Sequence, residues 1–92
     1  MIQFLVHEKA DTVGVATVDI TAGSDATGLY MDSQEELTVK ALDDIPLGHK
    51  IALTDLANGG IVTKYGEDIG KVVADIKKGN HVHIHNLKTK RW

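Results

Sequence analysis

The chain has no cysteine, a single proline, one phenylalanine, one tryptophan and two tyrosines in 92 residues. Without cysteine there can be no disulfide framework, no thiolate zinc site and no thiol nucleophile. With so few aromatic rings, the core is expected to consist of valine, isoleucine, leucine and alanine. A chain of this length buries only a small core, so it has little structure to spare for the walls of an active site.

Long apolar runs and a strong charge of one sign are also missing. No stretch approaches the roughly 20 apolar residues that span a bilayer, and the opening MIQFLV lacks the basic residues of a signal peptide. The net charge is only −3, and basic residues cluster only near the end, at Lys88, Lys90 and Arg91. These features argue against nucleic-acid and membrane partners and predict a cytoplasmic protein.

Short alternating segments between glycine-rich turns are typical of a β-rich domain. The segment 12–20 alternates like a strand, and 81–87 reads as the last strand. A hairpin is predicted with arms at 28–31 and 36–42, preceded by a turn at 21–28. We therefore predict one mainly β domain over residues 1–92, compact, with short strands and at most one or two single-turn helices.

Two further local features bear on this fold. Residues 54–60, TDLANGG, begin with helix-starting residues and end in glycine, which allows a single helical turn at most. The strings VDITAG, DDIPLG and ADIKKG share an acid, an isoleucine, two residues and a glycine. We interpret them as three similar chain reversals, because β-rich chains need many turns, and keep an internal duplication as the alternative.

Three of the five histidines, His81, His83 and His85, stand at every second position. In an extended strand they would share one face, with neighbours about 6.8 Å apart along the backbone. Two such imidazoles can reach one metal ion, whereas the outer pair, about 13.6 Å apart, cannot easily do so. The stripe is therefore either part of a metal or substrate site completed from elsewhere, or a solvated polar strand face.

Two other polar strings offer candidate site residues. In GHK, His49 suits general acid or base chemistry, and Lys50 can hold a carboxylate. In TKYGED, Lys64 and Tyr65 precede a glycine, which also fits an ordinary hairpin with Tyr65 on its rim. The chain contains no nucleophile elbow and no phosphate-binding glycine loop, so it has no self-sufficient catalytic motif.

Residues 43–86 closely resemble the SAF domain of altronate and galactarate dehydratases. The blocks IPLGHKIAL, TDLANGG, VTKYGEDIG and ADIKKGNHVHIHN follow the pattern of that family in order. The opening strands, FLVHEKADTVGVATVDITAG, fit it more loosely. The resemblance implies a SAF domain with the β-clip fold, and a large catalytic subunit as partner. It favours family members split into two chains, above all those that release sulfite from sulfolactate.

The resemblance also implies chemistry. These enzymes catalyse β-elimination from a 2-hydroxy acid, with water or sulfite as the leaving group, and need a divalent metal, commonly iron. The resemblance leaves open whether this chain or the large subunit binds most of the metal. The resemblance implies that His49 and Lys50 are catalytic and that Lys64 and Tyr65 bind the substrate. It further implies that His83 and His85 bind the metal, with His81 as a weaker candidate ligand.

Two alternatives stay open. The chain could be a non-catalytic SAF-type binding module, or an assembly subunit that only stabilises its large partner. On the enzymatic interpretation the expected partners are the large subunit and a small hydroxy acid, the chain is inactive alone, and it could form a homo-oligomer in isolation.

Overall fold

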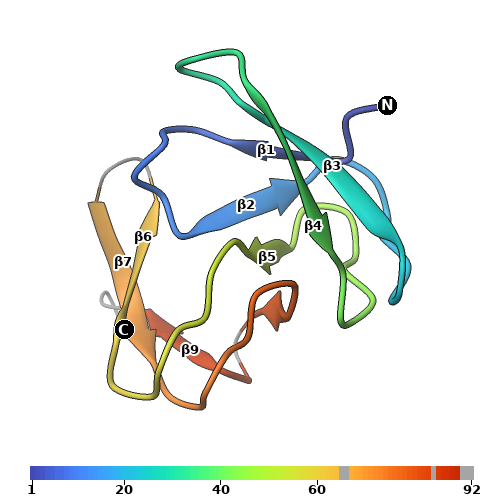
Figure 1. Cartoon of the computed structure of the whole chain (residues 1–92). Helices are drawn as coiled ribbons and strands as arrows, with labels where there is room; N and C mark the ends of the chain where they lie inside the picture. The colour runs from blue at the N-terminus through green and yellow to red at the C-terminus, as the bar shows by residue number, and fades with distance from the viewer. Residues whose placement is uncertain (65–66, 84, 90–92) are drawn as a thin grey trace.

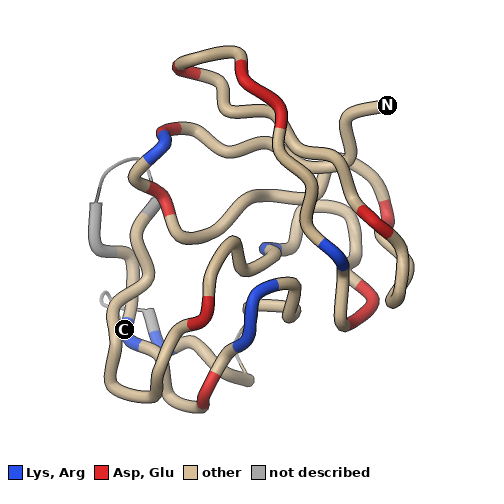
Figure 2. Tube along the Cα trace, viewed as in Figure 1, with Lys and Arg blue, Asp and Glu red and all other residues tan. Residues whose placement is uncertain are grey.

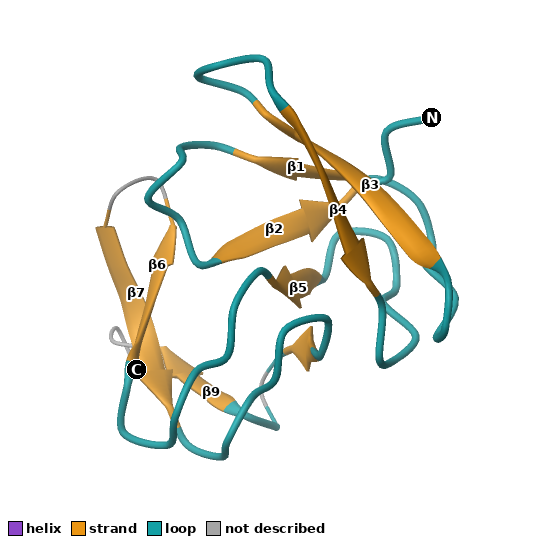
Figure 3. Ribbon diagram, in the orientation of Figure 1, coloured by secondary structure: helices purple, strands orange, loops and turns teal. Residues whose placement is uncertain are grey.

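The computed structural model describes residues 1–64, 67–83 and 85–89, with only the backbone for residues 64, 67, 68 and 89. The described residues form nine short strands and no helix (Figures 1 and 3). They therefore include no helix that could cross a membrane. The strands are β1 Phe4–Val6, β2 Val13–Ala16, β3 Asp25–Tyr30, β4 Glu36–Lys40, β5 Lys50–Ala52, β6 Ile61–Lys64, β7 Glu67–Val72, β8 His81–Val82 and β9 Leu87–Thr89. The predicted mainly β fold is confirmed.

The strands form two sheets. The larger has the order β4-β3-β1-β2-β5-β8 and the smaller the order β6-β7-β9. All neighbours are antiparallel except β1 and β3, which are parallel. Figure 1 shows β6, β7 and β9 on one side of the molecule and the β3–β4 hairpin on the other. β8 is thus an edge strand of the larger sheet, and the histidines lie at that edge.

The core consists of two apolar clusters, one mainly under the larger sheet and one between β5, β8 and the smaller sheet. Apart from one phenylalanine, its buried residues are valine, isoleucine, leucine and alanine, as the composition predicted: Phe4, Val6, Val13, Ala16, Ile20, Ala26, Val39, Ala41, Ile45, Ile51, Ala52, Val62, Val72, Ile76, Val82 and Leu87. Burying these side chains supplies the main driving force for folding.

The predicted turn at 21–28 is wrong in its second half, because β3 already begins at Asp25. Gly28 is a strand residue that lies against the ring of Phe4, and a Cβ there would fall 2.1 Å from the ring. The glycine therefore serves close packing of the single phenylalanine, not chain reversal. The hairpin itself is confirmed, with β3 and β4 paired antiparallel from Asp25 opposite Lys40 to Leu29 opposite Glu36.

The pattern Asp-Ile/Leu-x-x-Gly occurs four times, at 19–23, 44–48, 55–59 and 75–79. Sequence analysis recognised three copies and missed the third in chain order, because leucine replaces isoleucine there. The glycines all have φ between 84° and 92°, which L-residues with side chains rarely adopt. All four copies are chain reversals, so no helical turn forms in the predicted segment 54–60.

These reversals face one another in pairs. In the first pair Ile20 and Ile45 exchange two backbone hydrogen bonds of 2.9 Å. Asp19 and Asp44 each accept a backbone N–H from the opposite reversal, at 2.8 Å. Leu56 and Ile76, with Asp55 and Asp75, repeat the arrangement in the second pair. These reciprocal bonds fix the entry into β5 and β8, which follow the second and fourth reversals.

The predicted last strand over 81–87 is corrected. β8 ends at Val82, and β9 begins at Leu87. The backbone N–H groups of Asn86 and Leu87 both donate to the carbonyl oxygen of His83, at 3.1 and 2.9 Å, so the chain turns here. Residue 84 lies outside the described part of the chain.

Charges of both signs are interspersed along the chain trace in the view of Figure 2. Lys9 forms a salt bridge with Glu35, which links the turn after β1 to the tip of the β3–β4 hairpin. Both side chains are largely exposed to solvent, so the pair adds little to stability.

Candidate metal centre

His49 follows Gly48, the glycine of the second reversal. Its backbone N–H donates to the carbonyl oxygen of Pro46 at 2.9 Å, and its own carbonyl oxygen accepts from the N–H of Ala16 at 2.8 Å. Both backbone groups of His49 are therefore fixed before the chain enters β5, and the imidazole is held at the edge of the larger sheet.

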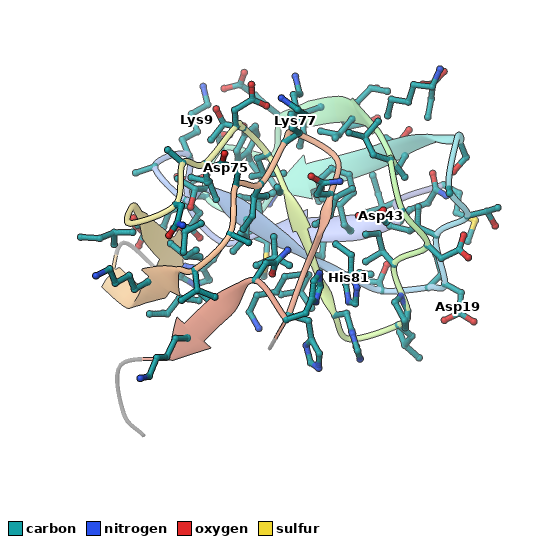
Figure 4. The ribbon with its side chains drawn as sticks, turned by 90° about the horizontal axis from the view of Figure 1, so that it is seen from below. Lys9, Asp19, Asp43, Asp75, Lys77 and His81 are labelled. Carbon is teal, nitrogen blue, oxygen red and sulfur yellow. The ribbon has the colours of Figure 1, made fainter. Side chains whose placement is uncertain are left out.

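β8 brings His81 and His83 to the same place. It pairs antiparallel with β5, with His81 opposite Ile51. Val82 is fully buried, whereas His81 and His83 are half-buried. Since consecutive side chains of an extended segment alternate, the two imidazoles leave the backbone on the side opposite Val82. Figure 4 labels the His81 side chain beside the ribbon, in the lower half of the molecule.

The imidazoles of His49, His81 and His83 form one cluster. Nδ1 of His49 and Nε2 of His81 are 2.8 Å apart, a hydrogen bond in which one ring donates an N–H to the other. The ring centroids of His49 and His83 are 4.1 Å apart, and those of His81 and His83 are 5.6 Å apart, with the rings stacked. The exposed ring of His85 lies 5.2 Å from that of His81.

This cluster fits a transition-metal ion. One nitrogen from each of His49, His81 and His83 lies within 4.8 Å of the others, and the described residues contain no second such group. In a tetrahedral site with bonds near 2.1 Å the nitrogens would be about 3.4 Å apart, so the stacked rings would have to rotate to direct their nitrogens at one ion. Three neutral imidazoles suit zinc, iron, nickel or copper, and leave further positions open.

The surroundings of His81 and His83 favour the neutral form of both rings. The pKa of His81 is lowered, first by burial and then by the charges that His49, His85 and His83 would carry, against a smaller opposing effect of Asp43. The pKa of His83 is lowered by burial and then by His49, Lys50 and His85. Neutral imidazole is the form that binds metals, so the lowered pKa values of His81 and His83 favour metal binding by these two rings.

A loss of stability at mildly acidic pH is expected for the metal-free chain. Because the folded-state pKa values of His81 and His83 are lowered, both rings are neutral above about pH 6.5, and stability is then highest. As pH falls from 6.5 through the folded values, the unfolded chain takes up more protons, and the free energy of unfolding decreases. Denaturant unfolding between pH 7.5 and 5.5 measures this slope.

The control for that experiment is the double variant His81→Gln/His83→Gln, which removes both titrating rings. Its free energy of unfolding should depend less on pH over the same range. A double variant with the wild-type slope would contradict the assignment of the effect to these two rings.

The remaining candidate site residues predicted from the sequence lie beside the cluster, at its margin or outside the described residues. Lys50 begins β5 next to His49, and its charge acts on His83. His85 lies at the margin of the cluster, outside the set of three. The backbone of Lys64 ends β6, but its side chain and the whole of Tyr65 lie outside the described residues. The sequence favoured His83 and His85 over His81, whereas the geometry joins His81 and His83 to His49.

Sequence reasoning missed the polar residues that hold this cluster. Oδ2 of Asp43 accepts the backbone N–H of His81 at 2.9 Å. The side chain of Asn86 donates to the carbonyl oxygen of His81 and accepts from the N–H of His83. Both residues lie inside the matched range 43–86, but nothing local in the sequence pointed to hydrogen bonds with the histidine backbone.

A separate hollow of about 370 Å³ lies between the first pair of reversals, lined by Asp19, Ile20, Thr21, Asp44, Ile45 and Pro46. It contains no histidine, and an oxygen of each of its two carboxylates already accepts a backbone N–H. The chemistry-bearing groups are at the histidine cluster, so we do not take the hollow as the functional site.

The sequence of residues 2–90 matches the family model of the altronate/galactarate dehydratase SAF domain. The chain is also 50% identical, over 92 residues, to the (2R)-sulfolactate sulfo-lyase subunit alpha of Chromohalobacter salexigens. That alignment covers 99% of this chain and 98% of the relative.

Two further relatives differ in how much of them is matched. The protein of the same description from Paracoccus pantotrophus is 59% identical over 61 residues, which cover 66% of this chain and 88% of the relative. The altronate dehydratase of Escherichia coli is 42% identical over 87 residues, which cover 95% of this chain but only 16% of that protein. The same unit thus matches nearly all of a small subunit and a small part of a much longer enzyme.

Proposed function

Because this chain belongs to the altronate/galactarate dehydratase SAF-domain family, we propose that it is the small subunit of a lyase. The reaction would be β-elimination from a 2-hydroxy acid: a base removes the proton at C2, and the leaving group departs from C3. The observation that carries the proposal is the cluster of His49, His81 and His83 in a chain half identical to a sulfo-lyase subunit.

We favour (2R)-sulfolactate as the substrate, with sulfite as the leaving group. Supporting this choice, the chain spans 98% of one sulfolactate sulfo-lyase subunit alpha and only 16% of a longer altronate dehydratase. An altronate-type sugar acid, which would lose water, is the other candidate, since it presents the same carboxylate and 2-hydroxyl group. Contacts from the partner subunit would decide between the two substrates.

His49, His81 and His83 would hold a divalent metal, for which we propose iron. A divalent cation supplies Lewis-acid stabilisation for the negative charge that develops beside the carboxylate when the C2 proton leaves. The ammonium group of Lys50 would attract and orient the substrate carboxylate, as a point charge does. His85, on the margin, would contact the substrate or partner, and the proposed substrate contacts of Lys64 and Tyr65 remain predictions.

A large subunit would complete the site. The relatives of similar length are named as subunits alpha, and the longer dehydratase has most of its length beyond the matched part. The three imidazoles are half-exposed, so one side of the cluster is open to a second protein. On this proposal the isolated chain has no turnover.

The experiment is co-expression of the chain with a large-subunit candidate, followed by anaerobic assay with ferrous iron. We expect the complex to release sulfite and a 2-keto acid from (2R)-sulfolactate, and neither subunit alone to do so. Altronate is the second substrate, with keto-acid formation as the readout. A stable, metal-loaded complex that turns over neither acid would contradict the lyase proposal and favour a binding or assembly role.

A further inference from the structure

His81 is held by side chains on both its backbone groups. Oδ2 of Asp43 accepts its N–H at 2.9 Å, and Nδ2 of Asn86 donates to its carbonyl oxygen at 2.7 Å. β8 is an edge strand, so these groups point away from β5, and no further strand of the described residues pairs with them. Asp43 and Asn86 thus make the backbone hydrogen bonds that a neighbouring strand would otherwise make.

Asn86 also holds His83. Its Oδ1 accepts the N–H of His83 at 2.9 Å, so one amide group grips the chain on both sides of Val82. The backbone of Asn86 donates to the carbonyl oxygen of His83 and accepts from the N–H of Val73, just after β7. The segment that carries two of the imidazoles is thereby fastened to the smaller sheet.

The burial of Asn86 makes this grip strong. Asn86 is 6% exposed, and Asp11 is the only other buried polar residue in the described part of the chain. A buried amide without hydrogen-bond partners is strongly unfavourable, and water has little access to replace them. The hydrogen bonds of the Asn86 side chain are therefore expected to persist. Asp43 is half-buried and also accepts from Nδ2 of Asn80 at 3.0 Å, which limits its own freedom.

We infer that Asp43 and Asn86 are positioning residues, which together we call the histidine clamp: they set the separation of the His81 and His83 rings and so the affinity of the site for metal. This rests on the proposed metal site but concerns residues that touch neither metal nor substrate. Outer-shell partners of this kind typically change metal affinity by about 10–100-fold when removed.

The test compares Asn86→Ala with Thr12→Val in the full-length chain. Thr12 is the matched control, because its hydroxyl also makes two hydrogen bonds to backbone, with the N–H and carbonyl oxygen of Thr63 between β2 and β6. Two readouts are taken: nitrogen-15 spectra of the metal-free imidazoles, which report the His49–His81 hydrogen bond, and Co²⁺ binding with its visible spectrum.

We expect Asn86→Ala to lose the imidazole hydrogen-bond signature, to weaken Co²⁺ binding about 10–100-fold and to alter its spectrum. Thr12→Val should keep all three at wild-type values while losing some thermal stability. Asp43→Ala should behave like Asn86→Ala, and Asp43→Asn, which keeps an acceptor oxygen, should retain most of the wild-type signal.

The outcomes separate this inference from the proposed function. If the wild-type chain does not bind Co²⁺, the proposed metal site is wrong. The positioning role of Asp43 and Asn86 is then tested by the nitrogen-15 spectra alone. If Asn86→Ala folds and keeps the wild-type imidazole signature, or loses no more of it than Thr12→Val does, the clamp is wrong even where Co²⁺ binds.

Discussion

Replacing His81 with alanine is expected to lower the metal affinity of the chain by about 100-fold to 1,000-fold and to abolish turnover of the assembled enzyme. Structural four-ligand sites are worth about 10–16 kcal/mol, so one ligand of such a set contributes about 2.5–4 kcal/mol. In the metal-free chain the ring of His81 is also hydrogen-bonded to that of His49. Removing His81 therefore leaves the His49 ring freer to move. Calorimetric metal titration and the sulfite assay measure the two effects.

His85→Ala is the matched control for that experiment. His85 lies in the same segment, and its ring is 5.2 Å from that of His81, but it is exposed and outside the set of three. We expect its replacement to leave metal affinity within about threefold of wild type. Equal losses for His81→Ala and His85→Ala would mean that the set of three is not the ligand set.

Replacing Gly79 with alanine is expected to cost about 2–6 kcal/mol of stability, much of what a small domain has. Gly79 has φ 92°, and a Cβ there would lie 2.0 Å from the carbonyl oxygen of Lys40, a backbone atom that cannot simply swing away. Since His81 is two residues further on, a shift that relieves the clash also displaces the cluster. Thermal and denaturant unfolding measure the loss.

Gly59→Ala is the control for this variant. Gly59 occupies the same position in the paired reversal and has φ 91°, but a Cβ there would meet nothing within 4 Å. It should therefore lose only the conformational term, about 1–2 kcal/mol. If both variants were equally stable, the contact with Lys40 would not be the reason for glycine at 79.

The general fold could be predicted because its signals are local. Alternating segments, a hairpin and glycine reversals are each read from a few neighbouring residues, and the apolar composition of the core follows from the scarcity of aromatics. The turn prediction at Gly28 was wrong because glycine occurs both in chain reversals and where a neighbouring side chain packs closely on the backbone. In the turn interpretation it reverses the chain, whereas here it makes room for the ring of Phe4, which is 24 residues away.

The candidate site could be predicted only in part. The stripe at 81, 83 and 85 is visible in the sequence, but its assumed extended geometry is wrong, since the strand ends at Val82 and the chain turns. The proximity of His49 depends on the pairing of β5 with β8, whose residues are about 30 apart and share no local signal. The role of Asn86 depends on the same turn.

The central claim is that this chain supplies imidazoles from β8 and from the entry to β5 to one metal ion in a shared active site. The direct measurement is the anomalous diffraction of iron in crystals of the assembled, iron-loaded complex. We predict a single strong peak about 2.0–2.2 Å from a ring nitrogen of each of His49, His81 and His83. A peak bound entirely by the large subunit, with His49 still hydrogen-bonded to His81, would contradict it.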